Sequence, residues 1–263
     1  MDKAGIKHKD IAKLIKSTKD RKKQGRYIVE GIKMVLEAVN MGIAERVFVS
    51  EEWWQEYIEK GCEKGIFDAC GYEVLEKQTF KQLTDTVTPQ GIIAVVSMKN
   101  DSVDNVIESV KKENICRLLI LENLQDPGNL GTILRTAEAA GYKGVLMNKG
   151  TVDIYNPKVV RSTMGAIFRV PFAYAESMDE IISICKENDI TVYGAALEGN
   201  DIREEKYDDA LAFIIGNESS GMTEESKKAC DKLVKIPMCG EVESLNASVA
   251  AAVLMYISNL SLI

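Results

Sequence analysis

Histidine is nearly absent from this chain of 263 residues, in which His8 is the only one. The six cysteines form no Cys-x-x-Cys pair and stand far apart, at positions 62, 70, 116, 185, 230 and 239. Zinc sites need cysteine and histidine ligands at short spacing, so we predict no metal site. A single histidine argues against histidine-based proton transfer, and the sequence shows no basic partner that would activate a cysteine as a nucleophile.

Long apolar runs are missing as well. No stretch of about 18 apolar residues is present, so we predict no transmembrane helix. The first residues, MDKAGIKHKDIAKLIK, lack the apolar centre of a secretory signal. We therefore expect a cytoplasmic protein with reduced cysteines. With 46% hydrophobic and 28% charged residues the composition is ordinary for a globular protein, and the length suggests two domains or one large one.

Positive charge is outnumbered by negative charge except at the N-terminus. The net charge is −7, yet residues 1–26 contain ten Lys/Arg and three Asp/Glu, which leaves −14 for the rest. Screening confines surface fields to roughly 10 Å, so a basic segment can bind phosphates while the body stays acidic. A solvated, partly disordered tail would explain the charge equally well. The candidate RNA contacts here are Lys13, Lys16, Lys19, Arg21, Lys22, Lys23 and Arg26.

The first half of the chain alternates between helical and strand-like patterns. We predict helices at 8–17, 31–40 and 51–60 and strands at 27–29, 46–50, 72–75 and 91–98. These elements make a small α/β domain over residues 1–99, followed by a polar linker at 99–104. Trp53 and Trp54 could stack on bases, but a core face of helix 51–60 is the favoured interpretation.

The second half, residues 105–263, repeats the alternation. The run ICRLLIL at 115–121 is typical of a strand buried on both faces. Strand, helix, strand alternation predicts a mostly parallel sheet with helices on both sides. The predicted strands are 115–121, 144–147, 169–173, 190–197, 210–215 and 233–236, and the predicted helices are 103–112, 129–140, 157–167, 177–188, 223–230 and 246–260.

Three polar, glycine-bearing segments follow apolar strands, where open α/β sheets bind ligands. In LENLQDPGNLGTILRTA (121–137), Asn129 opens a helix whose free N–H groups can hold an anion, with Arg135 near its polar face. In FIIGNESSG (213–221), Gly216 lets a ligand approach the strand end, and Glu218 follows in the loop. In VKIPMCGEVESLNAS (234–248), Ser244 or Asn246 can cap the last helix. Taken singly, each could be only a turn or a cap, and none is the GxGxxG fingerprint of a dinucleotide oxidoreductase.

Together, and with NPKVVRSTMGAIFRVP (156–171), these segments resemble the SpoU/TrmH family of RNA ribose methyltransferases, in the SPOUT superfamily. The resemblance covers roughly residues 115–260. Residues 1–98 resemble more weakly the family's substrate-binding domain, which is related to ribosomal RNA-binding proteins. That match lies in KDRKKQGRYIVEGIKMVLEAV, where Glu30 and Gly31 follow the basic run.

The resemblance implies a fold that composition does not reveal, a deep trefoil knot formed from about Ile190 onward. It also implies a homodimer and S-adenosylmethionine as the methyl donor, without a metal. By resemblance the residues at the donor would be Ala196, Leu197, Gly216, Ile236, Leu245 and Asn246, with Ser244 and Asn246 ordering their loop.

The resemblance makes Arg135 the main catalytic residue. Family proposals treat this arginine as a general base, but arginine is very hard to deprotonate. We expect it instead to bind phosphate and to stabilise the developing alkoxide. Asn129 would orient Arg135 or the ribose, and Glu218 would hold Arg135 or Asn129 in place. Arg161, in the fourth segment, is a further candidate RNA contact.

Ser219 and Cys239 depart slightly from the common pattern of the family. The expected substrate is rRNA, with tRNA as the second candidate. The alternatives are a non-catalytic RNA-binding protein that keeps the knotted fold, a methyltransferase acting on a base nitrogen and, more distantly, an oxidoreductase.

Overall fold

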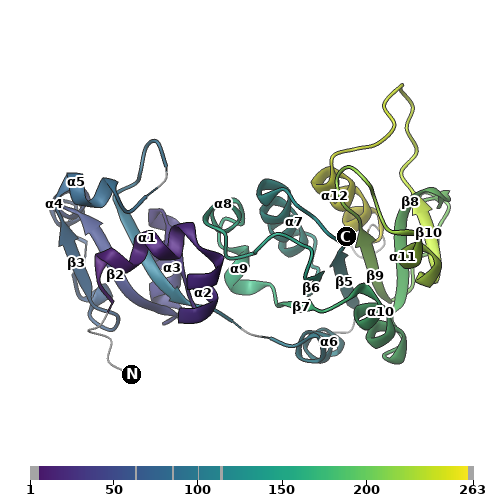
Figure 1. The fold of residues 1–263 in the computed structure, drawn as a ribbon, viewed down its shortest axis with the longest axis horizontal. Helices are drawn as coiled ribbons and strands as arrows, with labels where there is room; N and C mark the ends of the chain where they lie inside the picture. The colour runs from purple at the N-terminus through teal and green to yellow at the C-terminus, as the bar shows by residue number, and fades with distance from the viewer. Residues whose placement is uncertain (1–5, 63, 85, 100, 113–114, 260–263) are drawn as a thin grey trace. The chain divides into compact units, whose positions relative to one another are not determined.

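The computed structural model describes residues 6–62, 64–84, 86–99, 101–112 and 115–259, which form two compact units (Figure 1). The first unit comprises Met1–Lys99 and Tyr155–Gly165, and the second comprises Asn100–Ile154 and Ala166–Ile263. Residue 100 of the predicted linker and residue 260 of the predicted last helix lie outside the described residues.

The first unit is built on a four-stranded sheet with the order β1-β4-β2-β3. Strand β4 runs antiparallel to β1 and β2, whereas β2 and β3 are parallel. The central β4 is buried on both faces, because α1 covers one face through Ile11 and Leu14 and α3 covers the other through Val35. The strands are β1 Arg26–Glu30, β2 Ala44–Ser50, β3 Tyr72–Leu75 and β4 Ile92–Ser97. The helices are α1 His8–Lys16, α2 Thr18–Gln24, α3 Ile32–Asn40, α4 Glu51–Glu59 and α5 Lys77–Lys81, with a short 3-10 helix at Lys64–Phe67.

Helix α2 was not predicted, because the charge pattern of the basic segment is equally compatible with a disordered tail. It begins at a cap, since the Ser17 hydroxyl accepts a hydrogen bond from Asp20 N at 3.1 Å. It ends at Gly25, which takes the left-handed conformation (φ 64°) that glycine adopts without strain. Trp53 is 8% exposed and packs against Tyr57 and Phe67, so its predicted core position is confirmed.

The second unit contains a six-stranded sheet with the order β10-β8-β9-β5-β6-β7. Every neighbouring pair is parallel, which confirms the predicted parallel sheet. Helices α6 and α10 pack on one face, and α7 and α12 pack together on the other. The strands are β5 Cys116–Leu121, β6 Gly144–Asn148, β7 Phe172–Ala175, β8 Thr191–Asp201, β9 Ala210–Ile215 and β10 Lys232–Lys235. The helices are α6 Val103–Lys111, α7 Pro127–Ala139, α9 Ala166–Arg169, α10 Met178–Glu187, α11 Glu224–Ala229 and α12 Ala247–Ile257.

Three predicted elements differ clearly in the structure. The strand expected at 190–197 continues to Asp201 as β8. The single helix expected at 157–167 is broken into α8 (Pro157–Ser162) and α9, because Met164 and Gly165 both have positive φ angles, 51° and 96°. The strand expected at 169–173 begins later, at Phe172. No helix within the described residues has the length and apolar character needed to cross a bilayer.

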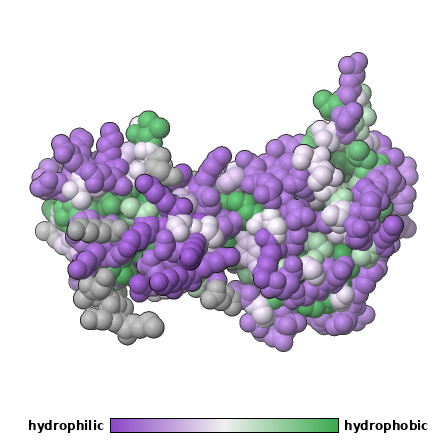
Figure 2. Space-filling view, viewed as in Figure 1, coloured by the Kyte–Doolittle hydropathy of each residue, from purple (hydrophilic) through white to green (hydrophobic). Residues whose placement is uncertain are grey.

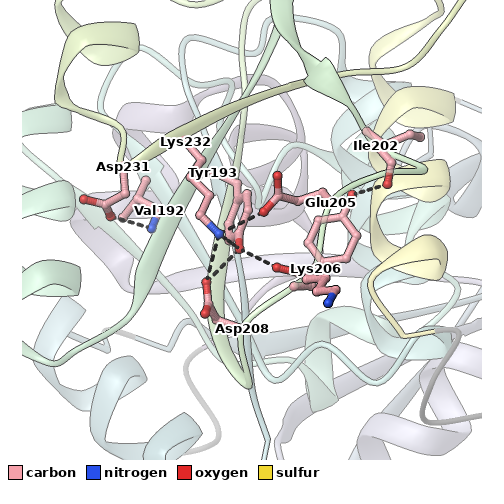
Figure 3. Close-up of polar contacts among 9 residues, drawn as sticks. Val192, Tyr193, Ile202, Glu205, Lys206, Asp208, Asp231 and Lys232 are labelled. Carbon is pink, nitrogen blue, oxygen red and sulfur yellow. Dashed lines mark hydrogen bonds and ion pairs between the residues drawn. The ribbon is translucent and has the colours of Figure 1, made fainter.

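A polar cluster closes the amino ends of β8 and β10 (Figure 3). The Lys232 ammonium lies 2.8 Å from Glu205 Oε1 and 3.0 Å from the Tyr193 hydroxyl, which donates to Asp208 Oδ2 at 2.7 Å. Burial raises the pKa of Tyr193, so this phenol stays protonated. These contacts tie the connection between β8 and β9 to the sheet, so the cluster is explained by its structural role.

Candidate cofactor pocket and active site

A cavity of about 330 Å³ lies at the carboxyl ends of β9 and β10 and beside residues 195–198 of β8, where the register between β8 and β10 shifts. Its walls include five residues predicted as donor contacts, namely Ala196, Leu197, Gly216, Ile236 and Leu245, and also Ser244. Asn246, the sixth, is not among the lining residues. The segment between β10 and α12 supplies one wall and projects away from the sheet (Figure 1). Leu197 and Val242 are 65% and 62% exposed, and Figure 2 shows hydrophobic surface at this projection.

Gly216 is needed by the loop that follows it. A Cβ atom at Gly216 would lie 2.3 Å from both Gly221 C and Met222 N, which no real side chain tolerates. The loop folds back because Asn217 and Gly221 exchange two backbone hydrogen bonds, of 3.0 and 2.9 Å. Gly216 was predicted because it would let a ligand approach, but the close approach of the backbone at residues 221 and 222 already requires glycine at this position.

Glu218 connects this loop to the start of α7. Its two carboxylate oxygens accept hydrogen bonds from Gln125 N at 3.0 Å, Asp126 N at 2.9 Å and the Asn129 amide at 3.1 Å. Partial burial alone would raise the pKa of Glu218, but these donors hold the pKa below its ordinary value. Glu218 is thus a carboxylate at neutral pH whose oxygens orient α7.

Asn129 extends the connection to the third motif. The Asn246 amide donates to Asn129 Oδ1 at 3.0 Å, while Asn246 Oδ1 accepts from Ser248 N at 2.9 Å at the start of α12. The cap of the last helix is therefore Asn246, and Ser244 faces the cavity instead. Asn129 of the first motif therefore meets Glu218 and Asn246, which lie 89 and 117 residues away, in one Glu218–Asn129–Asn246 network.

Arg135 lies on α7 and is exposed. Within the part of the chain that the structure describes, it has no ion-pair or hydrogen-bond partner, and the Asn129 amide is engaged by Glu218 and Asn246 instead. The structure therefore does not place Asn129 as the group that orients Arg135. A solvated guanidinium without an internal partner is available to an external anion such as a phosphate.

The predicted RNA contacts of the first unit fall into two groups. One group is exposed on α1 and α2 and consists of Lys13, Lys16, Lys19, Lys22 and Lys23. Arg21 is a correction to the prediction: it is 2% exposed, and its guanidinium donates to Leu14 O at 2.7 Å and Thr18 Oγ1 at 2.8 Å. It joins α1 to α2 and offers no surface to RNA.

The other two arginines are paired with carboxylates. Arg26 is half-buried and lies 2.7 Å from Glu45 Oε2. Arg161 lies 3.4 Å from Glu30 Oε2 within the first unit. Both are less accessible to phosphate than the five exposed lysines.

Sequence reasoning missed Glu122, directly after β5. It is 1% exposed, and its carboxylate accepts from Thr223 N at 3.2 Å, Thr223 Oγ1 at 2.7 Å and Ser226 Oγ at 2.8 Å. Glu122 thereby fixes the start of α11, next to the cavity residue Met222. The signal available in the sequence was an acidic residue at the end of the run ICRLLIL.

A further unpredicted pair lies on the cavity wall, where Lys227 Nζ and Glu198 Oε1 are 2.9 Å apart. No group of three or more potential ligand side chains suited to a metal occurs among the described residues.

Comparison with known proteins identifies this arrangement. The model of the SpoU rRNA methylase family matches residues 117–256, which include all three motifs. The chain belongs to the SpoU rRNA methylase family. Residues 7–94 match a second model, that of the MRM3-like substrate binding domain.

Relatives of this SpoU family member extend over nearly its whole length. The 23S rRNA (guanosine(2553)-2′-O)-methyltransferase RlmP of Bacillus subtilis is 34% identical over 252 residues, which cover 95% of this chain and 94% of the relative. The AdoMet-bound rRNA methyltransferase of Sinorhizobium meliloti is 26% identical with a TM-score of 0.84, covering 97% of this chain and 95% of that one. A solved RNA 2′-O ribose methyltransferase is 28% identical with a TM-score of 0.77, covering 100% and 98%.

Proposed function

We propose that this protein transfers a methyl group from S-adenosylmethionine to a ribose 2′-hydroxyl of ribosomal RNA. The observation that carries the proposal is the cavity at the strand ends, which adjoins the Glu218–Asn129–Asn246 network. The named activity of the Bacillus relative and the AdoMet-bound state of the Sinorhizobium relative support it. Transfer RNA is the second candidate substrate.

The cavity suits this donor in size, shape and charge. About 330 Å³ lies at the lower end of the range of small-ligand sites. The apolar walls of Leu197, Ile236 and Leu245 fit a flat base, and backbone groups at the strand ends can fix its orientation. Three acids line the cavity, Glu198, Glu218 and Glu243, against the two lysines 227 and 235, which favours a cationic ligand. S-adenosylmethionine supplies an already activated methyl group on a positively charged sulfur.

The remaining work of the chain is to align the acceptor and to stabilise its charge. Arg135 binds a phosphate next to the target ribose and stabilises the alkoxide that forms when the 2′-hydroxyl loses its proton. Glu218, Asn129 and Asn246 act together to hold the start of α7, the helix that carries Arg135. Ser244 orders the donor side of the cavity.

The first unit is proposed to bind RNA through its exposed lysines. Lys13, Lys16, Lys19, Lys22 and Lys23 lie on two consecutive short helices and present positive charge to the phosphate backbone. The match of residues 7–94 to a substrate binding domain supports this role. An rRNA substrate in turn supports a cytoplasmic location.

We also propose a homodimer. Helix α12 is strongly apolar, yet Val249 and Tyr256 on its outer face are 48% and 42% exposed. A second copy of the chain would cover these side chains. The fold family further supports a trefoil knot in the chain from β8 to α12.

The decisive experiment is transfer of labelled methyl from S-adenosylmethionine to unmodified large-subunit rRNA and to tRNA, followed by nucleoside digestion. A labelled 2′-O-methylnucleoside is the expected product. Arg135→Ala should bind the donor normally in calorimetry but lose about 10²-fold or more in turnover. Lys228→Ala, which removes an exposed charge from α11, is the control and should stay active.

Full activity of Arg135→Ala would overturn the assigned role of the arginine. A labelled base in place of a labelled ribose would indicate a base methyltransferase. A wild-type chain that binds RNA but neither binds nor uses the donor would instead be a non-catalytic RNA-binding protein.

A further inference from the structure

A short segment of the stretch that matches the methylase family belongs to the first unit of the structure and not to the second. Residues 155–165 lie well inside the stretch 117–256 that matches the SpoU methylase family, yet Tyr155–Gly165 belongs to the compact unit formed by Met1–Lys99. The segment leaves the second unit after β6 and returns to it at α9. The chain therefore connects the two units three times, at residues 99/100, 154/155 and 165/166.

Tyr155 makes the first attachment. Its side chain is 4% exposed, and its ring centroid lies 4.6 Å from that of Tyr27, which is 3% exposed. The Tyr155 hydroxyl donates to Lys99 O at 2.8 Å and accepts from Lys99 N at 2.8 Å. Burial raises the pKa of Tyr27, so this phenol stays protonated. Tyr155 is thus both packed against β1 and hydrogen-bonded at the end of the first unit.

Helix α8 makes the second attachment. The helix packs against β1, and its Val159 and Val160 are fully buried. Arg161 Nη1 lies 3.4 Å from Glu30 Oε2, and the Glu30 side chain is only 9% exposed. The other Glu30 oxygen accepts from Thr86 Oγ1 at 2.5 Å. One oxygen of the Glu30 carboxylate is therefore held by Thr86, and the other faces the Arg161 guanidinium.

We propose that Arg161 and Tyr155 are positioning residues that fasten the β6–α9 connection of the methyltransferase to the RNA-binding unit, with Glu30 as the partner of Arg161. RNA held by the first unit is then linked to the methyltransferase unit by three chain connections instead of one. Arg161 on this view acts through Glu30 and does not contact RNA. The inference rests on the proposed function, since it concerns delivery of the same RNA to the same site.

The test is a double-mutant cycle on rRNA methylation with Arg161→Ala, Glu30→Ala and the double variant. Each single change is expected to lower kcat/KM for rRNA about tenfold, and the double variant should be no worse than either single variant. The Kd for S-adenosylmethionine should change less than about twofold in all three, since the donor cavity is untouched. Lys158→Ala, on the exposed side of α8, is the matched control and should behave like the wild type.

A direct RNA contact predicts a different result. If Arg161 binds a phosphate, Arg161→Ala should reduce the slope of log affinity against log salt by about one, and the effects of Arg161→Ala and Glu30→Ala should multiply in the double variant. Either result would overturn the proposal. Tyr155→Phe keeps the ring packing but removes both hydrogen bonds to Lys99, and it should lower kcat/KM less than Tyr155→Ala does.

Hydrogen exchange separates failure of this inference from failure of the proposed function. In Glu30→Ala, amides of residues 155–165 should exchange faster while those of β5 and β9 keep their protection. This readout needs no methyl transfer. Unchanged exchange across 155–165 would overturn the inference even if the wild type methylates rRNA, and faster exchange would support it even if the substrate proves to be a different RNA.

Discussion

Replacing Gly216 by alanine should disable the donor cavity through one methyl group. The added Cβ would lie 2.3 Å from Gly221 C and from Met222 N, whereas non-bonded carbon atoms prefer roughly 3.5–4.0 Å. Both clashing atoms belong to the backbone, so no side-chain rotation can relieve the overlap. The loop at 217–221 must move away from β9 instead.

The cost of that movement can be worked from the contacts. Overpacking strain in a well-packed site amounts to about 1–3 kcal/mol. Opening the two hydrogen bonds between Asn217 and Gly221 adds about 0.5–1.5 kcal/mol each. We therefore expect Gly216→Ala to lower the free energy of unfolding by about 2–6 kcal/mol. Because this loop lines the cavity, donor binding should weaken by at least about tenfold.

Urea denaturation and calorimetric titration with S-adenosylmethionine measure the two effects. Gly240→Ala is the matched control, since a Cβ there meets no atom within 4 Å. The control should match the wild type in both assays. A Gly216→Ala variant with wild-type donor affinity would refute the reasoning, because it would mean that the loop geometry does not shape the cavity.

Four further predictions concern single side chains. The pKa of Glu218 is held below its ordinary value of 4.5, so its contribution to stability is present above that pH and is lost as the pH falls through the lower folded value. The difference in unfolding free energy between wild type and Glu218→Gln should therefore shrink in acid, and a pH-independent difference would contradict this. Lys22→Glu should weaken RNA binding and flatten its salt dependence without changing the free energy of unfolding. Arg21→Ala should lower the free energy of unfolding by about 2 kcal/mol, because the buried carbonyl oxygens of Leu14 and Ile15 lose their donor. Arg117→Met should lower the free energy of unfolding, measured by chemical denaturation, by about 3 kcal/mol or more. Arg117 is 3% exposed, and its guanidinium donates hydrogen bonds to Asp208 O, Asp209 O and Asn259 Oδ1. A variant with the wild-type denaturation midpoint would exclude that role.

The secondary structure of the second unit was largely predictable because its strands are short, apolar and bounded by turns. Residues 210–215 were predicted as a strand and form β9 with the same bounds. The break between α8 and α9 was not predicted, since Met164 takes a positive φ that its residue type does not favour. Helix α2 was missed because its mostly charged sequence shows no apolar periodicity, although Ser17 and Gly25 mark its two ends.

The candidate site was predictable in its members more than in its contacts. Gly216, Ile236 and Leu245 came from the motifs and line one cavity. Which atoms meet was not predictable, since Asn129 contacts Glu218 and Asn246 across separations of 89 and 117 residues. Glu122 was overlooked because its partners Thr223 and Ser226 are about one hundred residues away, and no local pattern marks that pairing.

The threefold crossing of the chain between its units bears on how such proteins can be recombined. A second unit separated at residue 100 would retain Tyr155 and Arg161 without Tyr27 and Glu30, which they contact in the first unit. A foreign N-terminal unit would have to match these side chains and supply a carboxylate where Glu30 stands. Exchange of substrate-binding units among relatives should therefore succeed only when the segment 155–165 is inherited together with the unit it packs against.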